Sequence, residues 1–368
     1  MKSSDSLFAD LHRTSVLKVI IGILIGIGLL LLVAYFVNIP ATIQVLRQNL
    51  ATPKGIVLAL LTGATYLLTW SIRGIRWKLF LNPFGKITNL TAIQIYQVAV
   101  FLNFLLPVRG GEIAKCLMLK RSADIAVSNS LPTVAMDKAL DLLPVLFILV
   151  LVPLLGVRMD IKLWMVLILV SLILVGMLCF AALATWKRDA AISLLQKPTG
   201  FLSQATASKV EVFATGFVDA LGMGMRQPKI FVPAIMLTCV AVIFDGLYIL
   251  LAFWTIGYHI PFGTAIFGYA LYNMFYILPT LPGQLGSNEA VGLLVWSGLL
   301  KLPQIQVTAM LIFTHAWTAV LMCAMGFTCL SALGLTISGV LKLRSGENTT
   351  TNEITVFSEQ MERDPPSG

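Results

Sequence analysis

Charged residues interrupt an otherwise apolar sequence at a few points, the first being the segment 106–112 around Arg109. The adjacent Gly110 and Gly111 allow close approach to the backbone, and a helix that begins there offers free N–H groups to an anion. The guanidinium of Arg109 is planar, permanently charged and suited to phosphate. We therefore predict that a lipid or another anion is bound by Arg109, Gly110, Gly111 and Lys115. Alternatively, Arg109 and Glu112 only neutralise each other, since they are three residues apart on a helix start.

The second charged group, Asp137, Lys138 and Asp141, lies inside an apolar stretch. Asp137 and Asp141 are four residues apart and share one helix face, so both can point into a helical bundle. Two carboxylates in a low-dielectric site repel each other, and one of them could hold a proton. The alternatives are a buried ion pair with Arg109 or Lys138, or a position near the cytoplasmic interface. The predicted charge-balancing or proton-coupling residues are Glu112, Asp137, Lys138, Asp141 and Glu289.

The third group follows Pro282 and Gly283 and ends at Glu289. Ser287 or Asn288 could cap the next helix, with Glu289 in its first turn, where a carboxylate is favoured. Single polar residues in apolar helices are more often interhelical hydrogen-bonding groups than ligands. The secondary site candidates are Arg76, Asp245, Asn288 and His315.

No motif for nucleophilic, metal or nucleotide chemistry accompanies these groups. The three histidines and five scattered cysteines form no zinc-type ligand cluster, and the sequence has no Walker A loop, GxSxG elbow or HExxH pair. We therefore predict no cofactor, no metal and no catalytic residue.

The composition indicates a membrane protein. Hydrophobic residues make up 58% of the chain, charged residues 12%, and the mean hydropathy is +0.89; a soluble domain carries about 25% charged residues. Several apolar stretches reach the roughly 20 residues that cross a bilayer as a helix. We predict an all-α polytopic bundle with spans near 16–37, 55–72, 134–155, 161–186, 229–256 and 304–340, the last being too long for one simple crossing.

Two further apolar regions, 90–119 and 262–300, contain proline and glycine at their centres. Non-helical backbone at membrane depth requires protein or a wet cavity to satisfy its polar groups. We expect two re-entrant helix–loop–helix hairpins. Their centres resemble each other, with Asn103, Pro107 and Glu112 in the first and Asn273, Pro279, Pro282 and Glu289 in the second. Such a pair indicates an inverted repeat and a transport site.

The distribution of lysine and arginine orients the chain. With the N-terminus inside, most cations face the cytoplasm, including Arg73, Arg76 and Lys115, while Arg47 and Lys301 lie outside. We predict a multi-pass plasma (inner) membrane protein with both termini cytoplasmic. Residues 1–344 form one transmembrane domain, with halves of about 16–186 and 229–340 joined by an amphipathic connector, 187–228. A disordered cytoplasmic tail, 345–368, follows.

The charged motifs resemble those of the flippase-like, lysylphosphatidylglycerol synthase transmembrane-region family over about residues 15 to 340. The resemblance rests on the following segments: Arg73-Gly74-Ile75-Arg76-Trp77; Pro107, Arg109, Gly111 and Glu112; Asp137-Lys138 with Asp141; and Pro282-Gly283, Gly286 and Glu289. It implies an all-helical membrane domain, prokaryotic origin and lipid translocation. Segment 313–317, with His315, departs from the pattern, in which arginine or tyrosine is frequent.

We therefore expect a flippase or translocator for an anionic phospho- or glycolipid, with membrane lipids as its partners and no nucleic acid. One alternative is a non-transporting membrane partner of a separately encoded glycosyltransferase. The other is an aminoacyl- or glycosyl-lipid synthase, which we consider weaker because no nucleotide or aminoacyl site is recognised. The sequence leaves the lipid, the driving force and the oligomeric state open.

Overall fold

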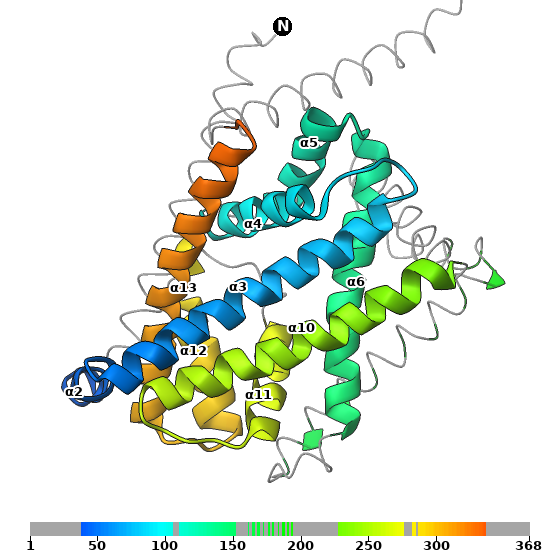
Figure 1. Ribbon diagram of the computed structural model, residues 1–368. Coiled ribbons are helices and arrows are strands. Elements are labelled where there is room, and N and C mark those ends of the chain that lie inside the picture. Colours follow the sequence, from blue (N-terminus) through cyan, green and yellow to red (C-terminus); the bar gives the residue numbers. More distant parts are fainter. Residues whose placement is uncertain are drawn as a thin grey trace, which may run out of the picture.

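The computed structural model describes residues 38–105, 110–151, 227–275, 282–284 and 286–335, with isolated positions between 161 and 193. Within these ranges every regular element is a helix (Figure 1). Three helices are long and apolar enough to cross a membrane: α3 (Pro53–Leu81), α10 (Pro228–Thr255) and α13 (Gln304–Ala332). The all-helical membrane architecture is thus confirmed. The predicted span 16–37, nearly all of the connector 187–228 and the tail 345–368 lie outside the described residues.

Two helix boundaries differ from the sequence prediction. A separate helix, α2 (Ile39–Leu50), precedes α3; its first turn is capped by the side chain of Asn38, which accepts from the N–H of Ala41 at 3.1 Å. At the other end, the described part of the stretch that seemed too long for one crossing, residues 304–335, contains one helix, α13, which stops at Ala332. A turn follows, in which Gly334 has a φ of +64°. This left-handed conformation suits glycine and ends the helix.

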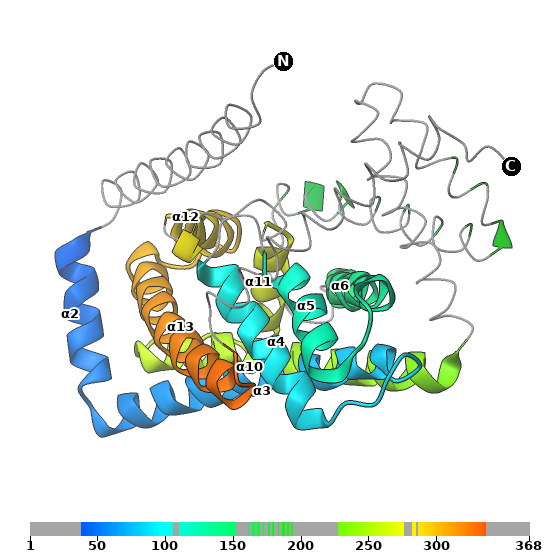
Figure 2. The same cartoon turned by 90° about the horizontal axis from the view of Figure 1, so that it is seen from above.

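Helices α3 and α10 lie side by side and antiparallel through the centre of the molecule (Figures 1 and 2). Thr62 near the start of α3 meets Thr255 at the end of α10, with 3.5 Å between their hydroxyl oxygens, whereas Arg76 near the end of α3 meets Thr238 in the first half of α10. Residues further along α3 therefore contact residues earlier in α10, as expected for two antiparallel helices. This pair therefore joins the two halves of the chain.

The first interrupted region contains two separate helices, as its proline and glycine residues predicted. These are α4 (Asn89–Leu105) and α5 (Gly111–Ala123), and residues 106–109 between them lie outside the described residues; α6 (Val127–Leu151) follows. Gly85 precedes α4 and Ile125 follows α5, and a Cβ on Gly85 would lie only 2.8 Å from Cγ1 of Ile125. The α4–α5 pair thus begins and ends at the same end of the molecule.

The second interrupted region also breaks at its proline and glycine residues. It contains α11 (Phe262–Phe275), a 3₁₀ turn η3 (Pro282–Gln284), and α12 (Ser287–Gly292), which continues as a π-helical segment η4 (Leu293–Leu299). Gly283 and Gly286 have φ values of +68° and +74°, a conformation that side chains disfavour. These two glycines allow the chain to turn between α11 and α12.

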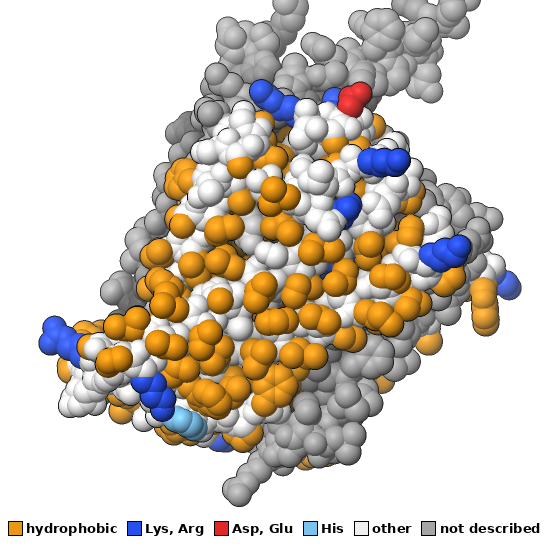
Figure 3. All heavy atoms as spheres, in the orientation of Figure 1, with side chains coloured by type: hydrophobic (Ala, Val, Ile, Leu, Met, Phe, Trp, Pro, Cys, Tyr) orange, Lys and Arg blue, Asp and Glu red, His pale blue; other side chains and the backbone are white. Residues whose placement is uncertain are grey.

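Apolar clusters hold the helices together, and two of them are large. One is built mainly from α3, α4, α5 and α13, around Trp77, Tyr96 and Phe101. The other is built mainly from α10, η4 and α13, around Phe253 and Trp296. The outer face is also largely apolar, with lysine and arginine near its margins (Figure 3). Exposed leucine and isoleucine on α3 and α10, such as Leu60 and Ile243, suit contact with lipid chains.

Candidate functional site: a cavity between the two halves

Helix α3 carries two arginines and a tryptophan on one face, because residues three and four apart project in similar directions. Arg73, Arg76 and Trp77 all point toward neighbouring helices, and Arg76 and Trp77 are fully buried. Gly74 lies among them, where a Cβ would stand 3.1 Å from the Cα of Ile93 on α4. The small residue lets α4 pack closely against α3 while the long side chains reach to either side.

Helix α6 presents three complementary acceptors on successive turns. Thr133 accepts from the indole N–H of Trp77 at 3.1 Å, and Asp137 pairs with Arg76 at 2.6 Å. Asp141, one turn further, pairs with Arg76 at 2.7 Å and lies 3.5 Å from Nε of Arg73. Helices α3 and α6 therefore pack antiparallel at this point, and each donor on α3 lies opposite an acceptor on α6. The partners of both carboxylates include the α3 arginines, which the sequence analysis had not considered.

Helix α10 completes this arrangement from the second half of the chain. Asp245 accepts from Arg73 at 2.7 Å, and Thr238 accepts from Arg76 at 3.1 Å. Each arginine thus binds both α6 and α10. Asp245 is confirmed as an interhelical hydrogen-bonding residue, and an ion pair of this kind keeps a carboxylate tolerable among apolar helices.

Glu112 on α5 is the centre of a second set of contacts. Its carboxylate lies 3.0 Å from Nζ of both Lys115 and Lys138, and it accepts from the side-chain amide of Asn103 at 3.2 Å. Lys138 also lies 3.7 Å from Asp141, which links this set to the arginines. The described partners of Glu112 are therefore lysines and an asparagine.

Lys115 is buried among aromatic rings, although the sequence analysis had counted it with the cations that face the cytoplasm. Its Nζ lies 3.6 Å from the ring centroid of Tyr96 and 5.2 Å from that of Trp77. The hydroxyl of Tyr96 donates to Asp137 at 2.8 Å. Ion pairing with Glu112 and the ring contacts explain why an ammonium group is stable in this place. Arg73 and Arg76 were assigned to the cytoplasm in the same way and are also buried.

The charges of the described cluster balance. Four cations, Arg73, Arg76, Lys115 and Lys138, meet four carboxylates, Glu112, Asp137, Asp141 and Asp245. These residues differ in solvent exposure. The side chains of Arg76 and Asp137 are 1% and 0% exposed, whereas that of Lys138 is 41% exposed. The inner pair is structural in character, and Lys138 is the cation best placed to exchange its partner for a ligand.

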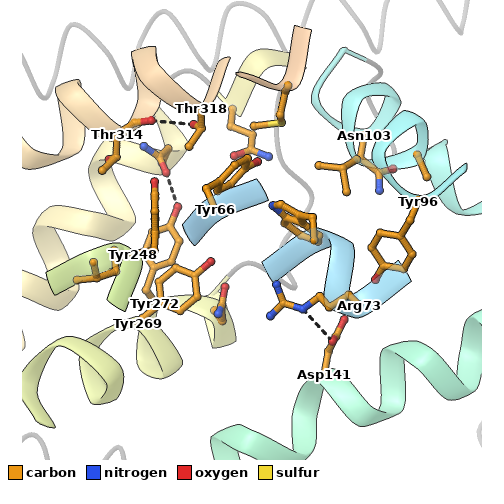
Figure 4. Close-up of a pocket in the computed structure, with 18 of the residues that line it drawn as sticks. Tyr66, Arg73, Tyr96, Asn103, Asp141, Tyr248, Tyr269, Tyr272, Thr314 and Thr318 are labelled. Atoms are coloured by element: carbon orange, nitrogen blue, oxygen red, sulfur yellow. Dashed lines mark hydrogen bonds and ion pairs between the residues drawn. The ribbon is translucent and has the colours of Figure 1, made fainter. Parts of the chain in front are cut away.

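A cavity of about 420 Å³ lies beside this cluster, lined by residues of every helix from α3 to α6 and from α10 to α13 (Figure 4). Among the described residues, the charged side chains that line it come from the first half of the chain: Arg73, Glu112, Lys115, Lys138 and Asp141. The second half contributes tyrosine, threonine, asparagine, glutamine and apolar residues. The cavity thus has one charged side and one neutral side.

A row of aromatic rings joins the two sides. Tyr272, Tyr269, Tyr248, Tyr66, Trp70 and Tyr96 follow one another with centroids 5.6 to 6.2 Å apart. Arg73 lies over Trp70 with its Cζ 4.8 Å from the ring centroid. The rings form a continuous wall between the arginines and the loop of the second interrupted region.

That second region is held by Glu289 and His315. The carboxylate of Glu289 accepts from the N–H of Gly286 at 2.8 Å and is hydrogen-bonded to His315 on α13, whose other ring nitrogen lies 2.8 Å from the carbonyl oxygen of Gly283. Glu289 therefore occupies the first turn of α12, as predicted. The N-cap is Gly286, so neither Ser287 nor Asn288 caps this helix; Ser287 begins it and donates to Gln284 at 3.0 Å.

The predicted anion site is only partly described. Arg109 lies outside the described residues. Gly110 is the N-cap of α5 and has an ordinary helical φ of −64°, and the N–H of Gly111 donates to the side-chain oxygen of Asn103 at 2.8 Å. A Cβ on Gly111 would lie 2.0 Å from the carbonyl oxygen of Ala99. Close packing of α5 against α4 therefore requires this glycine, and its N–H is already used.

The sequence analysis did not single out the tyrosines of the cavity or Arg73 as site residues. Arg73 was visible only as part of a motif, although its spacing to Arg76 placed both on one face. The tyrosines had no such signal, because Tyr66, Tyr248 and Tyr269 come from three different helices, and α3 is distant in sequence from α10 and α11. The described residues contain no group of three or more His, Cys, Asp or Glu that could hold a metal ion.

Comparison with known proteins places these motifs in a family. The family model for the lysylphosphatidylglycerol synthase TM region matches residues 19–326. One curated relative, UPF0104 membrane protein PH1989 of Pyrococcus horikoshii, is 28% identical over 180 residues, which cover 47% of this chain and 52% of the relative. The match thus spans about half of that protein's length, and no solved structure matches significantly. With the family model covering most of the chain, the protein belongs to the lysylphosphatidylglycerol synthase transmembrane-region family.

Proposed function

We propose that the protein translocates a lipid with an anionic head group, a phospholipid or glycolipid, across the bilayer. The observation that supports this most is the cavity itself, in which ionisable side chains of α3, α5 and α6 meet beside the long apolar helices α3, α10 and α13. Charges in such surroundings are costly and usually mark a path for a polar substrate. The volume of about 420 Å³ lies in the range of about 300–1,000 Å³ typical of small-ligand pockets.

The charge of the wall favours an anion. Three cations and two carboxylates line the cavity, while the compensating Asp137 and Asp245 lie behind the arginines. A phosphate can replace Glu112 or Asp141 as the partner of Lys138, which is the most exposed cation of the cluster. The carboxylate released in this way can take up a proton, so substrate binding and proton movement are coupled in the proposal.

The arrangement of helices supports an inverted repeat. Helices α3, α4, α5 and α6 have counterparts in α10, α11, α12–η4 and α13, with starts about 175 residues apart in each case. In both series a break separates the second and third helices. The antiparallel contact of α3 with α10 fits two halves of opposite orientation. We propose that the two broken pairs are re-entrant hairpins that meet at the cavity, which Asn103, Asn273 and Asn288 all line.

Arg109 retains its proposed role as a phosphate ligand on sequence grounds. It is joined directly to Gly110, the N-cap of α5, and its fork-shaped guanidinium suits a phosphate group. The four cations and four carboxylates of the described cluster balance without counting Arg109, which lies outside the described residues.

The test is lipid movement in liposomes that contain the purified protein. Fluorescent phosphatidylglycerol, phosphatidylcholine and a glycosylated lipid are compared by the fraction that an external quencher reaches over time. We expect Lys138→Gln to slow movement of anionic lipids at least about tenfold, the equivalent of about 1.4 kcal/mol in binding or barrier. Lys120→Gln provides a matched control, because Lys120 is exposed at the end of α5 and does not line the cavity.

Two outcomes contradict the proposal. Equal rates for the protein-containing and empty liposomes with every lipid tested would exclude translocation and leave the membrane-partner hypothesis. Equal effects of Lys138→Gln and Lys120→Gln on lipid movement would show that translocation does not depend on the cavity.

A further inference from the structure

The neutral side of the cavity has a distinct chemistry. Its walls carry the hydroxyls of Tyr66, Tyr248, Tyr269, Tyr272, Thr314 and Thr318 (Figure 4). Asn273, Gln284 and Asn288 add side-chain amides. Hydroxyl and amide groups both donate and accept hydrogen bonds, unlike carboxylates, which only accept, and ammonium groups, which only donate. A ligand that both donates and accepts at several points fits this surface.

We propose that this side binds an uncharged polyhydroxyl group, a sugar, on the head group of the lipid; the inference rests on the proposed translocation and names the substrate class. A sugar presents several hydroxyls together with apolar C–H faces. The sugar hydroxyls can donate to Thr314 and Thr318, whose own hydroxyl protons go to backbone carbonyls of α13, and can bond to the side-chain amide of Asn273. The C–H faces can lie against the aromatic rings. Tyr66, Tyr248 and Tyr269 form a connected ring surface, with centroid distances of 5.6 and 6.2 Å.

The surroundings disfavour the main rival ligand, a quaternary or primary ammonium group held in an aromatic cage. The described residues of the second half contribute no charged side chain to the cavity lining, so a cation there would meet no added carboxylate from them. The nearest charged residue of that half in the cluster, Asp245, is already paired with Arg73 at 2.7 Å. A neutral group needs no counter-charge in this position.

The geometry also gives the ligand an orientation. The row of rings leads from the tyrosines past Trp70 to Arg73 and Tyr96, on the charged side. One ligand can therefore place a phosphate or another acidic group near Lys138 and its sugar against the tyrosines. A glycolipid or glycosylated phospholipid combines both groups in one molecule.

The experiment is direct binding of matched lipids to the purified full chain in detergent, read by native mass spectrometry. The probes share the same acyl chains and are diacylglycerol, glucosyl-diacylglycerol, phosphatidic acid and phosphatidylcholine. We expect glucosyl-diacylglycerol to bind about tenfold more tightly than diacylglycerol, the gain from one or two net hydrogen bonds. Tyr269→Phe should reduce this gain and Tyr269→Leu should abolish it, while phosphatidic acid binding stays unchanged.

Tyr258→Phe is the matched control, since Tyr258 packs against Phe253 and does not line the cavity. Thr318→Val removes a second hydroxyl without touching the rings, which covers the case in which the Tyr269 variants do not fold. Equal binding of glucosyl-diacylglycerol and diacylglycerol would overturn the inference, as would a preference for phosphatidylcholine that is lost in Tyr269→Leu. Selective sugar binding without lipid movement in liposomes would instead contradict only the proposed translocation.

Discussion

At the scale of single residues, burial divides the charged cluster into a structural part and a part that can bind a ligand. Arg76 and Asp137 are closed off from solvent and make several mutual hydrogen bonds, among them Nε to Oδ1 at 2.9 Å. Glu112 and Lys138 are partly open and share the cavity. Removing one partner of a buried pair leaves an uncompensated charge, whereas a partly open group can be solvated.

This division predicts different effects on stability. Arg76→Gln should lower the free energy of unfolding by about 3–5 kcal/mol, because it removes the nearest cation from the buried Asp137 and leaves only Lys115, at 3.7 Å, as a charged partner. Adding Asp137→Asn should recover part of the loss, and Lys138→Gln alone should cost less than about 1 kcal/mol. Thermal or denaturant unfolding in detergent measures all three. Equal losses of unfolding free energy for Arg76→Gln and Lys138→Gln would show that burial does not divide the cluster into a structural part and a ligand-binding part.

At the scale of elements, close helix contacts explain residues that resembled ligand-binding positions. Gly111 was a candidate for phosphate binding, yet its missing side chain is needed where α5 meets the backbone of α4 at Ala99. Gly74 and Gly268 allow similar contacts, with α4 and with Trp296 of η4. Small residues at such crossings are typical of membrane helix packing.

We therefore expect Gly111→Ala to disrupt α4–α5 packing. Its Cβ would lie 2.0 Å from a backbone oxygen, which cannot move aside as a side-chain end can. The variant should unfold at a clearly lower temperature, with a loss on the order of 1–3 kcal/mol. Gly298→Ala is the control, because the nearest atom to its Cβ would be 3.7 Å away. Wild-type stability combined with lost lipid binding in Gly111→Ala would favour a ligand-binding role for this glycine.

At the scale of the whole molecule, the two series of helices form one unit around a shared cavity. Helix α2 contacts α13, so Arg47 on α2 and the start of α13 near Lys301 belong to the same end of the molecule. The loop with Lys86 lies beside the α5–α6 connection at Ile125, beyond the end of α3. The long helix α3 separates these two ends.

Accessibility to a membrane-impermeant thiol reagent tests this arrangement in cells. With the native cysteines replaced, cysteine at position 47 or 301 should react from outside, and cysteine at position 86 only after permeabilisation. The positive-inside rule sets the direction, and the structure requires that 47 and 301 behave alike. Reaction of 86 from outside with protection of 47 and 301 would reverse the orientation. Opposite behaviour of 47 and 301 would contradict the fold.

Local sequence features were enough to predict the helical membrane class and the separate helices of each interrupted region, because apolar length, proline and glycine act locally. They also identified Asp137 and Asp141 as neighbours on one face, since helical spacing is a local property. The partners of these carboxylates, in contrast, follow from how the helices pack. Arg76 and Asp137 are separated by 61 residues, and Arg73 and Asp245 by 172. Charge pairing between helices depends on which faces pack together, and that is fixed by the fit of side chains across the whole bundle rather than by any short segment.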